Sequence, residues 1–184
     1  TCLVGSEMCI RDSPEVVGVN LNNNLNEGIT STDLVLHITK LLRANKVVGS
    51  FIEFFGDGVE NLTVGDRATI SNMAPEYGAT NVLFPVDNST IEYLKMTGRT
   101  DEEISIVEDY SKKQKLWRNP GDTPKYNRVL NLDLSSIVPC VSGPKNPEDK
   151  INLDQFSNLA NEHSQLLYKK DLRENEFEVP NLGF

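Results

Sequence analysis

Hydrophobic and polar positions along this chain follow two alternating patterns. Short runs rich in β-branched and aromatic residues predict strands at 16–21, 47–56, 81–86 and 128–138. Apolar residues spaced three or four apart predict helices at 31–46, 63–78, 88–98, 101–117 and 152–167. Strands that alternate with helices are typical of a parallel sheet with helical connections. The pattern therefore predicts an α/β fold.

Two segments show these patterns most clearly. The helix predicted at 31–46 has N-cap candidates from Ser31 to Asp33, and its apolar face consists of Leu34, Ile38, Leu41 and Leu42. The strand at 128–138 alternates apolar and polar residues, which is typical of a half-buried strand, and its apolar positions are Leu130, Leu132 and Leu134. The segment 118–127, with two prolines and a glycine, is the best linker candidate.

The helix predicted at 63–78 contains an unusual polar pair. Asn72 and Glu76 are four residues apart, so a continuous helix would place both on one face. Pro75 falls inside this helix and predicts a kink, because proline removes a backbone donor. Gly78 predicts the end of the helix. Polar groups presented at a kink are either an exposed surface or a functional site, and the pattern leaves both open.

The first thirteen residues, TCLVGSEMCIRDS, fit neither pattern and contain two of the three cysteines. One interpretation is a disordered native tail. The one that we favour is a translated library adapter, because a back-translation of residues 3–12 resembles a transposase adapter used in sequencing. Residues 1–13 are then expected to be an adapter-derived tail, with the native sequence entering at about Pro14.

Composition narrows the function classes. The net charge is −9, and the acidity argues against general nucleic-acid binding, which needs a basic surface. No apolar run approaches the roughly 20 residues of a membrane span. Beyond residue 13 the one cysteine is Cys140, which excludes an internal disulfide framework there and favours a reducing, cytoplasmic location. His37 lies on a predicted helix beside apolar residues and is interpreted as structural.

Several blocks of the chain closely resemble the aconitase family, above all its large bacterial and iron regulatory members. They are DRATISNMAPEYGATNVLFPVD, STDLVLHITKLLRANKVVGSFIEFFGDGV, TIEYLKMTGR and VLNLDLSSIVPCVSGPKNPEDK, and the resemblance extends over about 16–154. It implies three-layer α/β/α domains of a four-domain, monomeric lyase of the tricarboxylic acid cycle, which converts citrate to isocitrate through cis-aconitate. It also implies a four-iron four-sulfur cluster in the parent enzyme.

The resemblance assigns residues and boundaries. Asn72 matches the family's asparagine beside the cluster, and Glu76 matches an active-site glutamate that pairs with a histidine from an earlier segment. The blocks with the cluster cysteines do not occur here, so we expect no metal ligand in this chain. The chain is expected to be an inactive internal fragment, with 14–122 from the second domain and 123–184 from the start of the third.

Two other functions remain open. A 2-methylcitrate dehydratase of the same family would share these blocks. An iron-regulatory, RNA-binding protein would use positions that match Arg43, Ser142 and Lys150. The acidic charge and Asn146, at a position where a basic residue is common, argue against nucleic acid as a partner. A small tricarboxylate is therefore the expected ligand, with no membrane partner.

Overall fold

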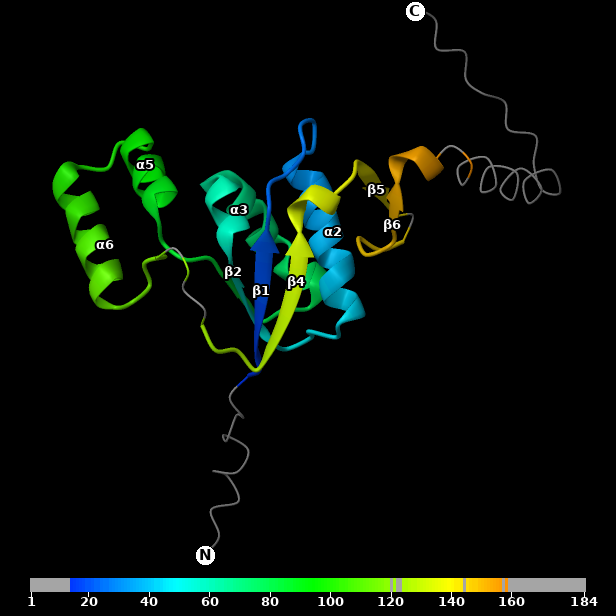
Figure 1. Ribbon diagram of the computed structural model, residues 1–184, viewed down its shortest axis with the longest axis horizontal. Coiled ribbons are helices and arrows are strands. Elements are labelled where there is room, and N and C mark those ends of the chain that lie inside the picture. The colour runs from blue at the N-terminus through cyan, green and yellow to red at the C-terminus, as the bar shows by residue number, and fades with distance from the viewer. Residues whose placement is uncertain (1–13, 120, 122–123, 144, 157, 159–184) are drawn as a thin grey trace, which may run out of the picture.

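Four parallel strands form the centre of the molecule (Figure 1). The computed structural model describes residues 14–119, 121, 124–143, 145–156 and 158. The strands lie in the order β3-β2-β1-β4, and they are β1 (Val16–Asn22), β2 (Phe51–Phe55), β3 (Asn81–Leu83) and β4 (Arg128–Asp133). The register places Val17 opposite Ile52 on one side and opposite Arg128 on the other. The predicted α/β fold with a parallel sheet is confirmed.

Helices connect the strands. The α-helices are α2 (Ser31–Ala44), α3 (Val64–Asn72), α4 (Ala74–Tyr77), α5 (Asn88–Met96) and α6 (Asp101–Lys113). Short 3-10 turns are η1 (Asp57–Asn61) and η2 (Leu134–Ser136), and a small antiparallel hairpin consists of β5 (Cys140–Ser142) and β6 (Lys150–Asn152). None of the helices in the described part of the chain is long and apolar enough to cross a membrane.

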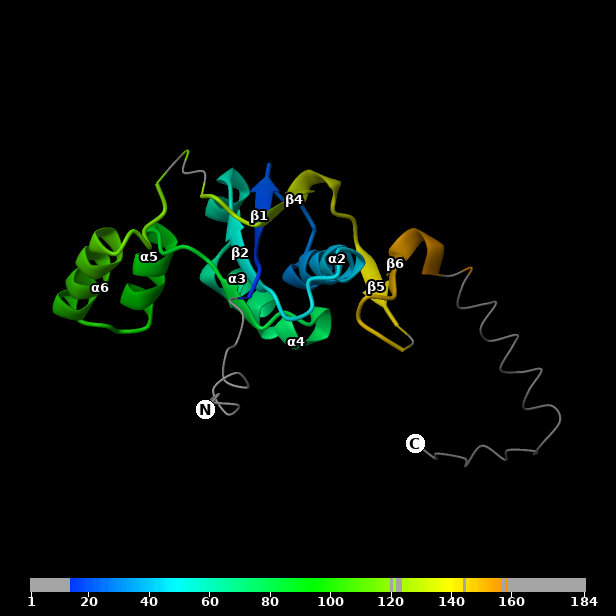
Figure 2. The ribbon, with the colours of Figure 1, turned by 90° about the horizontal axis from the view of Figure 1, so that it is seen from below.

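The core lies between one face of the sheet and the helices that follow β1 and β2. α2, α3 and α4 contact one another and lie on the same side of the sheet (Figure 2). The alternation of each strand sends every second side chain to this side. The fully buried apolar residues there include Val17, Val19, Leu21, Ile52 and Phe54 of the strands and Leu34, Ile38 and Leu42 of α2. Burial of each such side chain contributes about 1.5–3 kcal/mol. The second helical layer of the expected three-layer arrangement stays a prediction.

The opposite face of the sheet is partly polar. Gly18 leaves room there for the ring of Tyr126, since a Cβ on Gly18 would lie 2.2 Å from it. The ring also contacts Phe55, with the two centroids 5.0 Å apart. Tyr126, near the end of the segment predicted as a linker, thus lies against this face just before β4 begins. The expected domain boundary after residue 122 stays a prediction. β4, which follows this boundary in the sequence, pairs with β1, which precedes it.

Several predicted elements differ from those observed. The strand predicted from residue 47 begins at Phe51, because Val47 and Ser50 close a turn through Ser50 N–H and Val47 O, 2.9 Å apart. The helix predicted to residue 117 ends at Lys113. The strand predicted to residue 138 ends at Asp133, where η2 begins. Leu134 is nevertheless buried, as the alternation indicated.

Further differences concern the N-cap of α2, the strand β5 and the last predicted helix. The N-cap of α2 is Thr30, whose hydroxyl accepts from the Asp33 N–H while Asp33 accepts from the Thr30 N–H. Ser31 to Asp33 are therefore not the cap, and Asp33 is its partner. The segment 139–149, for which no strand or helix was predicted, contains β5. The helix predicted at 152–167 begins at Leu153, and beyond residue 158 it lies outside the described residues.

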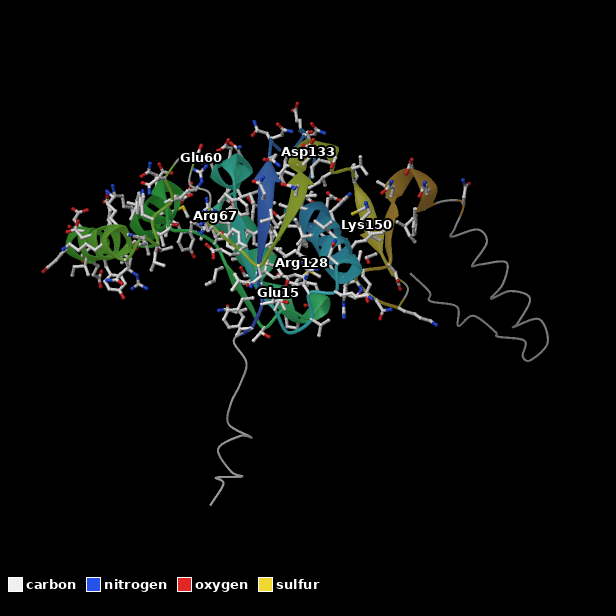
Figure 3. The ribbon with its side chains drawn as sticks, turned by 60° about the horizontal axis from the view of Figure 1, so that its bottom comes forward. Glu15, Glu60, Arg67, Arg128, Asp133 and Lys150 are labelled. Atoms are coloured by element: carbon white, nitrogen blue, oxygen red, sulfur yellow. The ribbon has the colours of Figure 1, made fainter. Side chains whose placement is uncertain are left out.

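The helices α5 and α6 form an arm beside the sheet (Figure 1). Its base is closed by the Val86 N–H, which donates to Leu116 O at 3.0 Å, and by the Arg118 N–H, which donates to Val86 O at 2.8 Å. A buried ion pair between Arg67 of α3 and Asp87, the N-cap of α5, joins the arm to the core. Figure 3 labels Arg67 where the arm meets α3.

Candidate functional site

The candidate site lies where α3 ends and α4 begins. Asn72 is the last residue of α3, and Met73 separates it from α4, which carries Glu76. The expectation that Asn72 and Glu76 share one face of a continuous helix is therefore wrong. Pro75 lies in the first turn of the new helix, where its missing N–H costs nothing, instead of kinking an existing one.

Two features fix the geometry of this break. The buried Tyr77 hydroxyl donates to the Ile70 carbonyl at 2.9 Å, which joins α4 to α3 across Met73. Gly78 ends α4 with a φ of 80°, as the sequence predicted, and a Cβ at this position would also lie 2.9 Å from Val48 Cγ2. A side chain larger than hydrogen is disfavoured on both counts. The break is thus a defined structural feature.

The Glu76 side chain turns partly inward at this break. Glu76 is half-buried, and its Oε2 is buried without a hydrogen-bond partner among the described residues. An unsatisfied buried carboxylate oxygen is costly, so it calls for a donor from elsewhere. Asn72, by contrast, is exposed. One buried carboxylate oxygen and one exposed amide therefore flank the break at Met73.

Arg43, at the end of α2, lies beside Glu76. Its Nε donates to the Glu76 backbone carbonyl at 2.7 Å and lies 3.6 Å from Oε1 of Glu148, in the loop of the β5–β6 hairpin. These residues are far apart in sequence, and hydrophobic patterning carries no signal for such a contact. The resemblance singled out both Arg43 and Glu76 but gave no reason to join them.

The other two positions of the RNA hypothesis are also engaged within the chain. The Ser142 hydroxyl contacts the carbonyls of Asn146 and Pro147, which shapes the hairpin loop. Lys150 Nζ lies 2.6 Å from His37 Nε2, and Figure 3 shows Lys150 on the hairpin beside α2. Arg43, Ser142 and Lys150 therefore each make contacts that fix the hairpin or its neighbours.

A cluster of titratable groups joins α2 to this hairpin. His37 Nδ1 lies 2.9 Å from Asp33 O and 3.8 Å from Cys140 Sγ, while the Cys140 N–H donates to Asp33 Oδ1 at 2.8 Å. Burial raises the pKa of the Cys140 thiol, so it is not an activated nucleophile. Burial and the facing Lys150 charge lower the pKa of His37. The cluster fits the structural role that the sequence indicated for His37.

This cluster predicts a pH dependence of stability. Because folding lowers the pKa of His37, the unfolded chain binds a proton more readily, and the free energy of unfolding falls as the pH drops below about 6.5. We expect His37→Gln to reduce this loss between about pH 7 and pH 5.5, measured as the change in Tm. Lys150→Met should reduce it in part. An unchanged slope in both variants would contradict the assignment.

The described residues do not fit a metal centre. No group of three His, Cys, Asp or Glu side chains among them could hold a metal ion. Cys140 contacts Asp33 and His37 and is the free cysteine of this part of the chain. An iron–sulfur cluster needs several thiolates, and the described residues contain one cysteine.

Comparison with known proteins identifies the family. The model of the aconitase family (aconitate hydratase) matches residues 3–181. Aconitate hydratase A of Rickettsia typhi is 49% identical over 172 residues, 93% of this chain and 20% of the relative. The same enzyme of Rickettsia prowazekii is 54% identical over 150 residues, 81% and 17%, and that of Escherichia coli 49% over 140 residues, 76% and 16%. The chain belongs to the aconitase family and spans about a fifth of the length of these relatives.

Proposed function

We propose that the protein to which this chain belongs is an aconitate hydratase, a hydro-lyase that interconverts citrate and isocitrate through cis-aconitate. The family match and the names of the relatives support this activity. The observation that carries the proposal within the chain is the buried, unpartnered Oε2 of Glu76 in the block that resembles the family's active-site helix. A cytoplasmic, monomeric enzyme of the tricarboxylic acid cycle completes the proposal.

The role proposed for Glu76 follows from its position. A carboxylate that accepts a hydrogen bond from an imidazole N–H fixes the orientation of the ring and stabilises its protonated form. Glu76 Oε2 would accept that bond from a histidine supplied by another part of the parent protein. Asn72, exposed at the end of α3, would offer its amide to the ligand or to the cluster beside it. The described residues supply no ligand set for the cluster, so the chemistry proposed for this chain is confined to Glu76 and Asn72.

The alternatives differ in their support. A 2-methylcitrate dehydratase would use the same Glu76 and is separated by substrate preference alone. Regulatory RNA binding through Arg43, Ser142 and Lys150 is less favoured, because all three side chains make contacts within the chain. The test is to assay the complete parent enzyme with citrate, isocitrate and 2-methylcitrate. Preference for the first two supports the proposal, and preference for the third favours the alternative.

The chain alone should bind no stoichiometric iron–sulfur cluster and should show no hydratase activity. The reason is that Cys140, the one cysteine beyond residue 13, is held against Asp33 and His37, whereas a cluster of this kind takes several thiolates. Anaerobic reconstitution of the chain, followed by absorption spectroscopy and iron determination, measures this directly. A brown protein with stoichiometric iron would contradict the expectation.

A further inference from the structure

The contact between Arg43 and Glu76 satisfies a backbone carbonyl at the end of α4. α4 is a single helical turn, and the last carbonyls of a helix have no donor within it. The carbonyls of Ala74 and Pro75 accept from the Gly78 N–H at 2.9 and 3.1 Å. The next carbonyl, that of Glu76, accepts from Arg43 Nε at 2.7 Å. The arginine thus completes the end of α4 from outside.

The guanidinium is itself held between two elements. Arg43 comes from the last turn of α2, and Glu148 Oε1 lies 3.6 Å from its Nε on the hairpin side. Both side chains are partly exposed, so the ion pair contributes little to stability. Its effect is geometric, because the Glu148 carboxylate favours a position of the guanidinium in which Nε faces the Glu76 carbonyl.

We propose that Arg43 is a positioning residue that fixes the main chain of Glu76 and so holds its carboxylate in the orientation needed for proton transfer, with Glu148 fixing the guanidinium. The catalytic part of this inference rests on the proposed function of Glu76. The carbonyl and the carboxylate belong to one residue, so a main-chain shift at Glu76 moves both. A misplacement of about 1 Å at a reacting group can cost as much as 10²-fold in rate.

The first test uses the full 184-residue chain and needs no activity. Arg43→Met keeps the apolar stem but removes the donor, and we expect amide hydrogen exchange at Gly78 and Ala79 to become about tenfold to hundredfold faster, as expected for the loss of a hydrogen bond from a charged group. Exchange in β1, at Val19, should not change and serves as the control for folding. Arg99→Met, at the exposed turn between α5 and α6, is the matched control. Unchanged exchange at Gly78 and Ala79 in Arg43→Met would overturn the inference.

The second test uses the complete, cluster-loaded enzyme. Arg43→Met should lower kcat by roughly tenfold to 10²-fold with KM little changed, and Arg43→Lys should restore only part of it. In Glu76→Gln, adding Arg43→Met should lower kcat no further, because the arginine acts through Glu76. Independent, multiplying losses would overturn the inference. Full activity of Glu76→Gln alone would instead refute the proposed function, and with it the catalytic role of Arg43, while faster exchange would still support the structural contact.

Discussion

In the complete enzyme, Glu76→Gln should lower turnover by about 10²–10⁴-fold, the usual worth of general acid–base assistance, with the KM for citrate little changed. Glutamine keeps the size of the side chain and one acceptor oxygen but loses the negative charge. Oε2 is buried without a hydrogen-bond partner among the described residues, and we propose that its partner is a histidine of the parent protein. Without the charge, a protonated imidazole at that position loses its stabilisation.

Steady-state kinetics and iron content should be measured together for this variant. Glu92→Gln is the matched control, because Glu92 is exposed on α5 in the arm beside the sheet, and its turnover should match that of the unmodified enzyme. Near-normal turnover in a cluster-loaded Glu76→Gln enzyme would contradict the catalytic role. Loss of iron together with activity would instead assign Glu76 a structural role.

The second large effect concerns stability. Asp87→Ala should lower the free energy of unfolding by about 3–5 kcal/mol, the usual cost of breaking a buried ion pair by removing one partner. Asp87 accepts from both terminal nitrogens of Arg67, at 3.0 and 2.6 Å, and also caps α5 through the Thr90 N–H. Its removal leaves the buried guanidinium with the Val59 carbonyl, 3.0 Å from Nη2.

Urea unfolding of the chain, followed by circular dichroism, measures this loss. Asp57→Ala is the matched control, since Asp57 also pairs with an arginine, Arg118 at 3.4 Å, but its side chain is 89% exposed. Exposed ion pairs contribute about 0–1 kcal/mol, so this variant should unfold almost as the unmodified chain does. Similar losses in the two variants would show that burial of the Arg67–Asp87 pair is not what matters.

The sequence predicted the elements best where periodicity is strong and local. The apolar face of α2 and the alternation of β4 follow directly from residue spacing. The alternation is confirmed, and Leu34, Ile38 and Leu42 of the predicted face are buried, whereas Leu41 is half-buried. The break at Met73 could not be predicted in the same way. Pro75 is compatible with either a kink or a new helix start, and the burial of Tyr77 against Ile70 decides between them.

The true cap of α2 did have a local signal. Thr30 is followed three residues later by Asp33, the spacing of a reciprocal cap, whereas Ser31 is followed at that distance by Leu34. The Arg43–Glu76 contact had no such signal, because it depends on how the end of α2 packs beside α4. The resemblance assigned Glu76 to the candidate site. The structure adds that its Oε2 is buried without a partner among the described residues and that Arg43 donates to its carbonyl.

We propose that this segment supplies an aconitate hydratase with a functional Glu76. A chimera tests it most directly, with residues 16–156 of this chain replacing the corresponding segment of a relative such as aconitate hydratase A of Escherichia coli. The ultraviolet absorbance of cis-aconitate then reports the rate. We expect the cluster-loaded chimera to hydrate cis-aconitate and Glu76→Gln within it to abolish most of this activity. A folded, cluster-loaded chimera that is inactive, or one that tolerates Glu76→Gln, would contradict the role proposed for Glu76.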